Sequence, residues 1–319
     1  MNDAFFSLLF SSYSLFMIIR VTTPILFASM ACLIAKKAGV RNITIEGTML
    51  ISALIGVIVS AKCQNVWIGV LLGMVSGVAI ALFLGYFHLF LDTDIWMSGI
   101  GINRIAEGGT IFLMFVLTGD KGSTAALASL SVPDVDIPVI KDIPLLGDIL
   151  SGHSLFTYLA IICVIAIYIL LYKTPLGLRI RAVGEYSMAV ESVGKKSSHI
   201  KLVALAISGL CSSLGGMFMS MSYASRFAKN MMAGRGFIGI AAESMGSGTP
   251  FGAAISAFIF GVFDALANIM QSFSFPTELV LMIPYLATLV GLVVYSSVRK
   301  LKEKKRIRNA NKKIAKEAK

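Results

Sequence analysis

The 319-residue chain is 56% hydrophobic and only 14% charged, whereas about a quarter of the residues are charged in ordinary soluble domains. A mean hydropathy of +0.83 excludes a soluble globular fold, because water cannot be kept from so much apolar surface in a chain of this length. The formal net charge of +11 could suggest nucleic acid, but no aromatic or glycine-rich binding module accompanies it.

Nine apolar runs follow one another along the chain. Seven approach the length needed to cross a ~30 Å hydrocarbon core, and two shorter, glycine-interrupted runs could be helices only if neighbours shield them. The sequence therefore predicts an all-α fold, a polytopic transmembrane helical bundle of about 8–10 membrane helices including short or broken ones. The long runs are 14–35, 65–90, 97–118, 153–172, 202–222, 250–270 and 279–298, and the short runs are 43–60 and 236–247.

The charges between these runs predict the orientation. Residues 299–319 carry eleven Lys or Arg against two Glu, a net charge of +9, and residues 173–201 carry six against two. Basic juxtamembrane segments usually lie in the cytoplasm, where they meet anionic lipid. Residues 119–152, with five Asp and three Pro, read as an extracytoplasmic loop. We expect a transmembrane domain over residues 1–298 and a basic cytoplasmic tail over 299–319.

Chemical motifs for catalysis or cofactors are not evident. The four cysteines are scattered without a C-x-x-C pair, which argues against a metal site. The three histidines lie far apart, and the sequence holds no G-x-S-x-G or H-E-x-x-H pattern. Residues 194–197 (GKKS) fail the phosphate-loop pattern. We therefore expect no catalytic residue, cofactor or metal, and any ATPase must be another chain.

Within residues 173–201, the stretch Glu185–Val193 is predicted to form a short helix. Gly184 precedes it, Glu185 suits the positive end of a helix, and Gly194 with the lysines after it provides a stop. Several small or apolar side chains on this segment suit a groove in a partner better than open water. They are Met188, Ala189, Val190 and Val193.

Three acidic residues stand in or beside apolar runs. Ionisable groups in a membrane are costly unless paired or hydrated, so they mark either a solute pathway or a structural pair. Both interpretations stay open for Glu46, whose carboxylate could form an ion pair with Arg41 or another basic group. They also stay open for Glu243, in the second short run, and for Asp264, in the middle of a long one.

Two asparagines are further candidates for the pathway. Asn42 precedes the first short run, where a role as helix cap is the simpler interpretation. Asn103 shares a predicted helix with Arg104 and Glu107, which are three residues apart and favour a local ion pair. Asn103 would then be free to point into a polar cavity.

Three blocks of sequence resemble the permease subunits of ATP-binding cassette importers for branched-chain amino acids, simple sugars and nucleosides. Residues 38–47 (AGVRNITIEG) resemble the family's A-G-V-x-N-I-x-x-E-G. Residues 233–242 (AGRGFIGIAA) with 250–253 (PFGA) resemble its A-G-x-G-F-I-x-I-A-A and P-x-G-A. The third block resembles its coupling loop, R-A-x-G-x-N-P-x-A-A-x-x-x-G, through Arg181, Ala182, Gly184, Ala189 and Gly194.

The coupling block departs from the family pattern at Glu185-Tyr186-Ser187 and at Val190, so the fit to a particular ATPase stays open. In the other two blocks, the Asn, Ile, Glu and Gly of residues 38–47 and the Gly-Arg-Gly-Phe of residues 233–242 are most similar to the purine-nucleoside and simple-sugar branch of the family. The chain's length resembles the shorter of two paired permeases.

The resemblance implies a transmembrane permease subunit that moves a nucleoside or a simple sugar across the bacterial cytoplasmic membrane by alternating access. It implies a cytoplasmic ATP-binding subunit, a second permease subunit in a heterodimer, an extracytoplasmic solute-binding protein, and no nucleic acid. ATPase coupling would then involve Arg181, Gly184, Glu185, Met188, Ala189, Val193 and Gly194, and the solute pathway Asn42, Glu46, Asn103, Glu243 and Asp264. The alternatives are an ion-coupled secondary transporter, in which the acids would be ion ligands, and an intramembrane enzyme.

Overall fold

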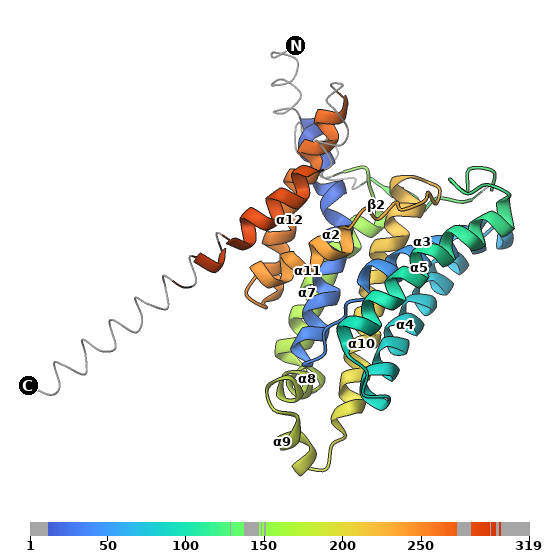
Figure 1. The fold of residues 1–319 in the computed structure, drawn as a ribbon. Coiled ribbons are helices and arrows are strands. Elements are labelled where there is room, and N and C mark those ends of the chain that lie inside the picture. Colours follow the sequence, from blue (N-terminus) through green and yellow to red (C-terminus); the bar gives the residue numbers. More distant parts are fainter. Residues whose placement is uncertain are drawn as a thin grey trace, which may run out of the picture.

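The computed structural model describes residues 12–127, 129–136, 147, 149, 151–272, 282–293, 295–297 and 300. Within this part of the chain, seven helices are long and apolar enough to cross a membrane (Figure 1). The predicted all-α membrane bundle is therefore confirmed. These helices are α2 (Ser12–Lys37), α3 (Ile45–Cys63), α4 (Val66–Phe90), α5 (Ile95–Thr118), α7 (Leu155–Lys173), α10 (Ser197–Phe218) and α12 (Pro250–Ser272).

Shorter elements complete the described part. A π-helical turn, η1 (Met219–Tyr223), extends α10, and an apolar helical segment, Met282–Ser297, follows α12. The remaining elements are α8 (Pro175–Glu185), α9 (Ser187–Ser192), α11 (Arg235–Met245) and the antiparallel strands β1 (Asp134–Val135) and β2 (His153–Ser154). The basic tail, except Lys300, and part of the 119–152 loop lie outside the described residues.

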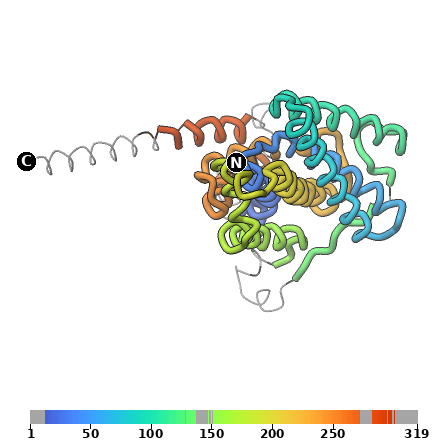
Figure 2. Tube along the Cα trace, turned by 90° about the horizontal axis from the view of Figure 1, so that it is seen from below, coloured from blue at the N-terminus to red at the C-terminus, as the bar shows by residue number. Residues whose placement is uncertain are grey.

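The centre of the bundle is formed by α2 and α10, whose apolar stretches are 78% and 72% buried. Helices α4 and α5 bury much less and lie on one side of the bundle, as Figure 2 shows from below. Their exposed apolar side chains must meet lipid or another membrane protein, since water would not solvate such a surface favourably.

Close packing of α4 against α3 and α10 depends on glycine. A Cβ atom added at Gly69 would stand 2.7 Å from the Gly56 carbonyl oxygen, and one at Gly77 would stand 2.5 Å from the Ser213 Cβ. In lipid, helices associate through such short backbone approaches, because apolar side chains gain little by leaving lipid for protein. Glycine at these two positions therefore lets the helix backbones approach.

The loops predicted to face opposite sides of the membrane lie at opposite ends of the bundle. At one end, α8 rests on the end of α2 so closely that a Cβ atom at Gly184 would stand 2.1 Å from the Lys37 carbonyl oxygen. At the other end, the loop after α5 pairs with the segment after η1, where the Thr124 N–H donates to the Phe227 carbonyl (2.9 Å). Which end faces the cytoplasm stays a prediction.

The two runs predicted to be short, α3 and α11, both begin inside the bundle (Figure 1). The turn before α3 is tied to the middle of α10, where the Asn42 Nδ2 amide donates to Ser208 Oγ (2.9 Å). The first short run, 43–60, is shifted to Ile45–Cys63. Contrary to its classification as short, this helix of 19 residues is long and apolar enough to cross a membrane. Helix α11 has only 11 residues, so it depends on neighbours, as predicted.

The predicted coupling helix is displaced and divided. Tyr186 is extended (φ −155°, ψ 96°) and separates α8 from the six-residue α9, so Glu185 ends α8 instead of starting the next helix. Helix α8 was missed in a segment read as loop, although its start carries a signal. Thr174 caps it by accepting from the Gly177 N–H (3.1 Å), and Pro175 is its first residue, a pairing that favours helix initiation.

Candidate functional site

The Glu46 carboxylate lies at the N-terminus of α11. The Gly234 N–H donates to its Oε1 and the Gly236 N–H donates to its Oε2, each at 2.8 Å. Helix N-termini present free N–H groups and a positive dipole end, so they bind carboxylates well. A Cβ atom at Gly236 would stand 2.7 Å from Glu46 Oε2, which explains why glycine is needed there. Glu46, in the first turn of α3, thus joins the starts of α3 and α11.

This arrangement differs from the pairing considered for Glu46. The Arg41 guanidinium lies over the Trp96 ring, 5.5 Å from its centroid, and the Glu46 oxygens are occupied by backbone groups instead. A sequence pattern could not identify this partner, because the donors are N–H groups some 190 residues away.

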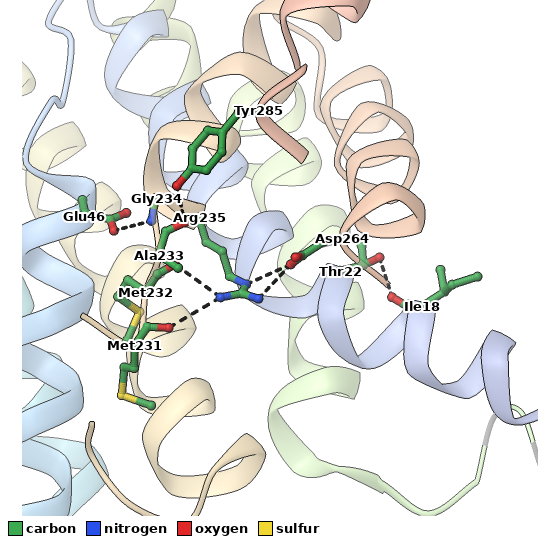
Figure 3. A network of polar contacts seen from close by, with 10 residues as sticks. All are labelled: Ile18, Thr22, Glu46, Met231, Met232, Ala233, Gly234, Arg235, Asp264 and Tyr285. Atoms are coloured by element: carbon green, nitrogen blue, oxygen red, sulfur yellow. Dashed lines mark hydrogen bonds and ion pairs between the residues drawn. The ribbon is translucent and has the colours of Figure 1, made fainter. Parts of the chain in front are cut away.

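Asp264 in α12 forms an ion pair with Arg235, the first residue of α11 (Figure 3). Its Oδ2 accepts from Arg235 Nε at 3.0 Å and lies 2.9 Å from Nη2. Both side chains are nearly buried. Arg235 Nη1 also reaches the Met232 carbonyl at 3.4 Å. The pair fixes α11 to α12 on the opposite side of α11's N-terminus from Glu46 (Figure 3).

The Asn103 side-chain amide is hydrogen-bonded at both ends, whereas we expected it to be free to point into a polar cavity. Its Nδ2 donates to the Ile43 carbonyl and its Oδ1 accepts from the Gly47 N–H, both at 2.9 Å. The N–H groups in the first turn of a helix have no acceptor within the helix, and the Asn103 Oδ1 provides one for Gly47. Asn103 therefore connects α5 to the start of α3.

A cavity of about 650 Å³ opens beside this junction. It brings together Glu46, Asn103 and Asp264 from the predicted pathway set. The Arg104–Glu107 ion pair also lines it, with Arg104 Nη1 2.8 Å from Glu107 Oε2, as predicted. The polar lining residues are Glu46, Asn103, Arg104, Glu107, Asn230, Arg235, Asp264, Asn268, Gln271 and Tyr285.

Several of these residues were missed in the sequence. Asn268 follows Asp264 by four residues and Gln271 follows Asn268 by three, so the three side chains share one face of α12. A polar stripe of that spacing within an apolar span is a usable signal. Tyr285 carries no such signal; its Oη donates to the Ala233 carbonyl at 2.8 Å (Figure 3).

Asn42 does not line this cavity. It is fully buried, donates to Ser208 Oγ at 2.9 Å and accepts at Oδ1 from the Thr44 N–H at 3.0 Å. All of its polar atoms therefore order the turn before α3. Its place in the pathway stays a prediction. Asn42 is not the helix cap either, because Thr44 is the N-cap of α3, but its bonds order the turn from which that helix starts.

Glu243 lies at the other end of α11, next to the α8–α9 segment. Its Oε2 lies 2.7 Å from Lys36 Nζ, and its side chain is wholly buried. It lines a second cavity, of about 430 Å³, together with Lys37, Arg181 and Gly184. Glu243 is thus separate from the 650 Å³ cavity and next to the predicted coupling residues.

The α9 segment presents exposed apolar side chains at the end of the molecule. Met188 and Val193 are 65% and 73% exposed, whereas Val190 packs inward at 9%. Gly194 ends the segment with φ +77°, a conformation that glycine adopts without strain. Arg181, in α8, lies over the Tyr172 ring at 5.0 Å. Residues 187–194, which we call the α9 knob, thus form a small projection that exposes apolar side chains.

The chain is similar to permease subunits of known importers. It is 31% identical over 280 residues to the guanosine ABC transporter permease protein NupQ of Bacillus subtilis, covering 84% of this chain and 87% of NupQ. It is 27% identical over 287 residues to the nucleoside ABC transporter permease protein NupC of Lactococcus lactis, covering 86% and 89% of the two chains.

A solved structure, PsaBC from Streptococcus pneumoniae in complex with Fab, has a similar fold. Its TM-score is 0.56 at 12% identity, covering 95% of this chain and 100% of that one. The model of the family described as branched-chain amino acid transport system / permease component matches residues 14–302. The chain therefore belongs to that family and is a permease component of a membrane transport system.

Proposed function

We propose that the chain is the membrane subunit of an ATP-driven importer and carries a neutral polar solute, foremost a nucleoside, through the 650 Å³ cavity by alternating access. One observation carries the choice of a neutral solute: Glu46 already occupies the N-terminus of α11. In transporters with broken helices, such N-termini receive the carboxylate of an anionic solute. Here the protein's own carboxylate takes that place.

The other charges of the cavity support the same choice. Arg235 is paired with Asp264, and Arg104 with Glu107. Among the described lining residues, every ionisable acid and base thus has a partner, and no free charge is offered to an ion. A nucleoside, the solute class in the names of NupQ and NupC, is neutral. A simple sugar, the other class implied by the sequence resemblance, is neutral too.

The Arg104–Glu107 pair also supports a second permease subunit. Arg104 is 77% and Glu107 42% exposed in the middle of the apolar helix α5. Charged groups facing lipid are strongly unfavourable, so this face should meet water and protein instead. A second permease, different from this one, would close the cavity from that side and complete the pathway.

The ends of the bundle fit the remaining partners. The α9 knob would dock into a cytoplasmic ATP-binding subunit as a short helix in a groove. The opposite end, with the 119–152 loop, would receive an extracytoplasmic solute-binding protein. The chain would lie in the bacterial cytoplasmic membrane with residues 1–298 as its transmembrane domain and 299–319 as a cytoplasmic tail, and it would itself catalyse no reaction.

Uptake by the reconstituted complex tests this proposal. Proteoliposomes with the ATPase, both permeases and the binding protein should import guanosine only when ATP reaches the ATPase. V193E places a charge on the exposed knob and should abolish both assembly with the ATPase and uptake. K62E, an exposed charge reversal at the far end of α3, is the matched control and should leave both unchanged. Uptake that follows an ion gradient without the ATPase would establish the secondary-transporter alternative instead.

Cysteine labelling tests the orientation. In a chain freed of its four native cysteines, L130C should react with an impermeant maleimide on intact cells, and K195C only after the membrane is opened. The reason is that basic loops stay in the cytoplasm. Labelling of K195C on intact cells would reverse the proposed topology.

A further inference from the structure

One amide in the cavity wall lacks the partner that buried amides normally have. The Asn268 Nδ2 atom is buried, and it forms no hydrogen bond in the described part of the chain. Asn268 lies on α12, one turn beyond Asp264, and lines the 650 Å³ cavity. Burying a donor without a partner is unfavourable, so native proteins rarely keep one without a purpose.

The contrast with other asparagines makes Asn268 distinctive. Asn103 and Asn42 use both ends of their amides in hydrogen bonds, Asn103 to the start of α3 and Asn42 to Ser208 in α10 and to Thr44 in its own turn. Those two amides hold the fold together. Asn268 contributes no such bond through Nδ2, so turning its amide toward a solute in the cavity would break no Nδ2 hydrogen bond within the described part of the chain.

The surroundings of Asn268 suggest which kind of molecule. Gln271 lies on the same face of α12, and Asn230 lines the same cavity from the segment before α11. Phe237, on α11, lines it with a ring that is 47% exposed. A carboxamide offers a donor and an acceptor side by side, which match the adjacent groups on the edge of a nucleobase. Exposed aromatic rings are the usual surfaces on which single bases stack.

We propose that Asn268 is a solute-contact residue that hydrogen-bonds the edge of a nucleobase, with Phe237 as the stacking surface. This inference rests on the proposed function and narrows its solute to a nucleoside. A sugar alone would present hydroxyls to the amide but would leave the Phe237 ring without a base to stack on.

The test uses the full complex in proteoliposomes and measures tritiated guanosine and glucose uptake per folded complex. N268L keeps the size of the side chain but removes the amide. We expect guanosine uptake at low concentration to fall about tenfold or more, as for the loss of a good polar contact. The amount of folded complex should not fall, because an unpaired donor has been removed. N268Q retains an amide and should restore part of the uptake.

Two matched variants separate a solute contact from a structural role. S256A changes a polar residue on the same helix that does not line this cavity and should behave as wild type. N42L removes a fully bonded amide and should lower the amount of folded complex. Normal guanosine uptake by N268L, or a loss explained by less folded complex, would overturn the inference. Wild-type import of glucose but not guanosine would overturn it while leaving an ATP-driven importer in place, and wild-type import of neither would overturn both proposals.

Discussion

The D264A variant is expected to lose most of its folded protein. Removing one partner of a buried ion pair typically costs about 3–5 kcal/mol, because the other charge is left buried and unpaired. Arg235 is only 12% exposed, and it is the first residue of α11, where the helix dipole disfavours a positive charge. Without Asp264, its remaining hydrogen bonds within the described residues are the long ones to the Met231 and Met232 carbonyls, at 3.5 and 3.4 Å.

Two further variants make this expectation specific. The double variant R235L/D264L removes both charges and should recover much of the folded protein lost in D264A. E107Q breaks the Arg104–Glu107 pair, which has the same short separation of 2.8 Å but is exposed in the isolated chain. Exposed pairs contribute at most about 1 kcal/mol, so E107Q should stay close to wild type.

The measurement is the monodisperse fraction in detergent size-exclusion chromatography, together with the melting temperature of the purified chain. A D264A variant as stable as E107Q would contradict the buried-pair interpretation. A double variant no better than D264A would show instead that Asp264 acts through something other than the charge of Arg235.

Most of the fold could be predicted because membrane helices carry strong local signals. The long apolar runs mark α2, α4, α5, α7, α10 and α12 to within a few residues, since a helix must bond its own backbone in lipid. The helix boundaries were predicted wrongly in segments that are not apolar. Residues 173–201 carry charge and look like loop, yet α8 forms there because Thr174 and Pro175 start it and α2 provides a surface to pack on.

The acidic residues could be identified from the sequence, but not their partners. The cost of a charge in lipid singles out Glu46, Glu243 and Asp264 from the sequence alone. Their partners come from segments far away: two backbone N–H groups for Glu46, Lys36 for Glu243. Local spacing carries no information about such contacts. The Arg104–Glu107 pair could be predicted because its two residues lie three apart in one helix. The other contacts join segments that are far apart in the sequence.

Removing Lys36 should destabilise the folded protein more than neutralising Glu243, its partner in an ion pair. Glu243 is wholly buried, whereas the Lys36 side chain is 40% exposed. The Glu243 Oε1 atom has no hydrogen-bond partner in the described part of the chain, so Lys36 provides the main compensation for the carboxylate. K36M leaves a buried, unpaired charge, which typically costs about 3–5 kcal/mol.

E243Q should be much milder than K36M. The glutamine is neutral, and the freed Lys36 ammonium can turn toward water through its exposed side, so we expect a loss of about 1 kcal/mol, near that of an ordinary hydrogen bond. The double variant K36M/E243Q should be about as stable as E243Q, because no buried charge remains. K37M is the matched control: Lys37 lines the same 430 Å³ cavity but forms no ion pair among the described residues.

Thermal unfolding of the four variants in one detergent gives the comparison directly. The expected order of melting temperature is K37M near wild type, then E243Q together with the double variant, and K36M lowest. Equal losses in K36M and E243Q would mean that the hydrogen bond, and not the buried charge, accounts for the stability of the pair. A K36M protein as stable as K37M would show that Lys37 can replace Lys36, since both ammonium groups reach the same cavity.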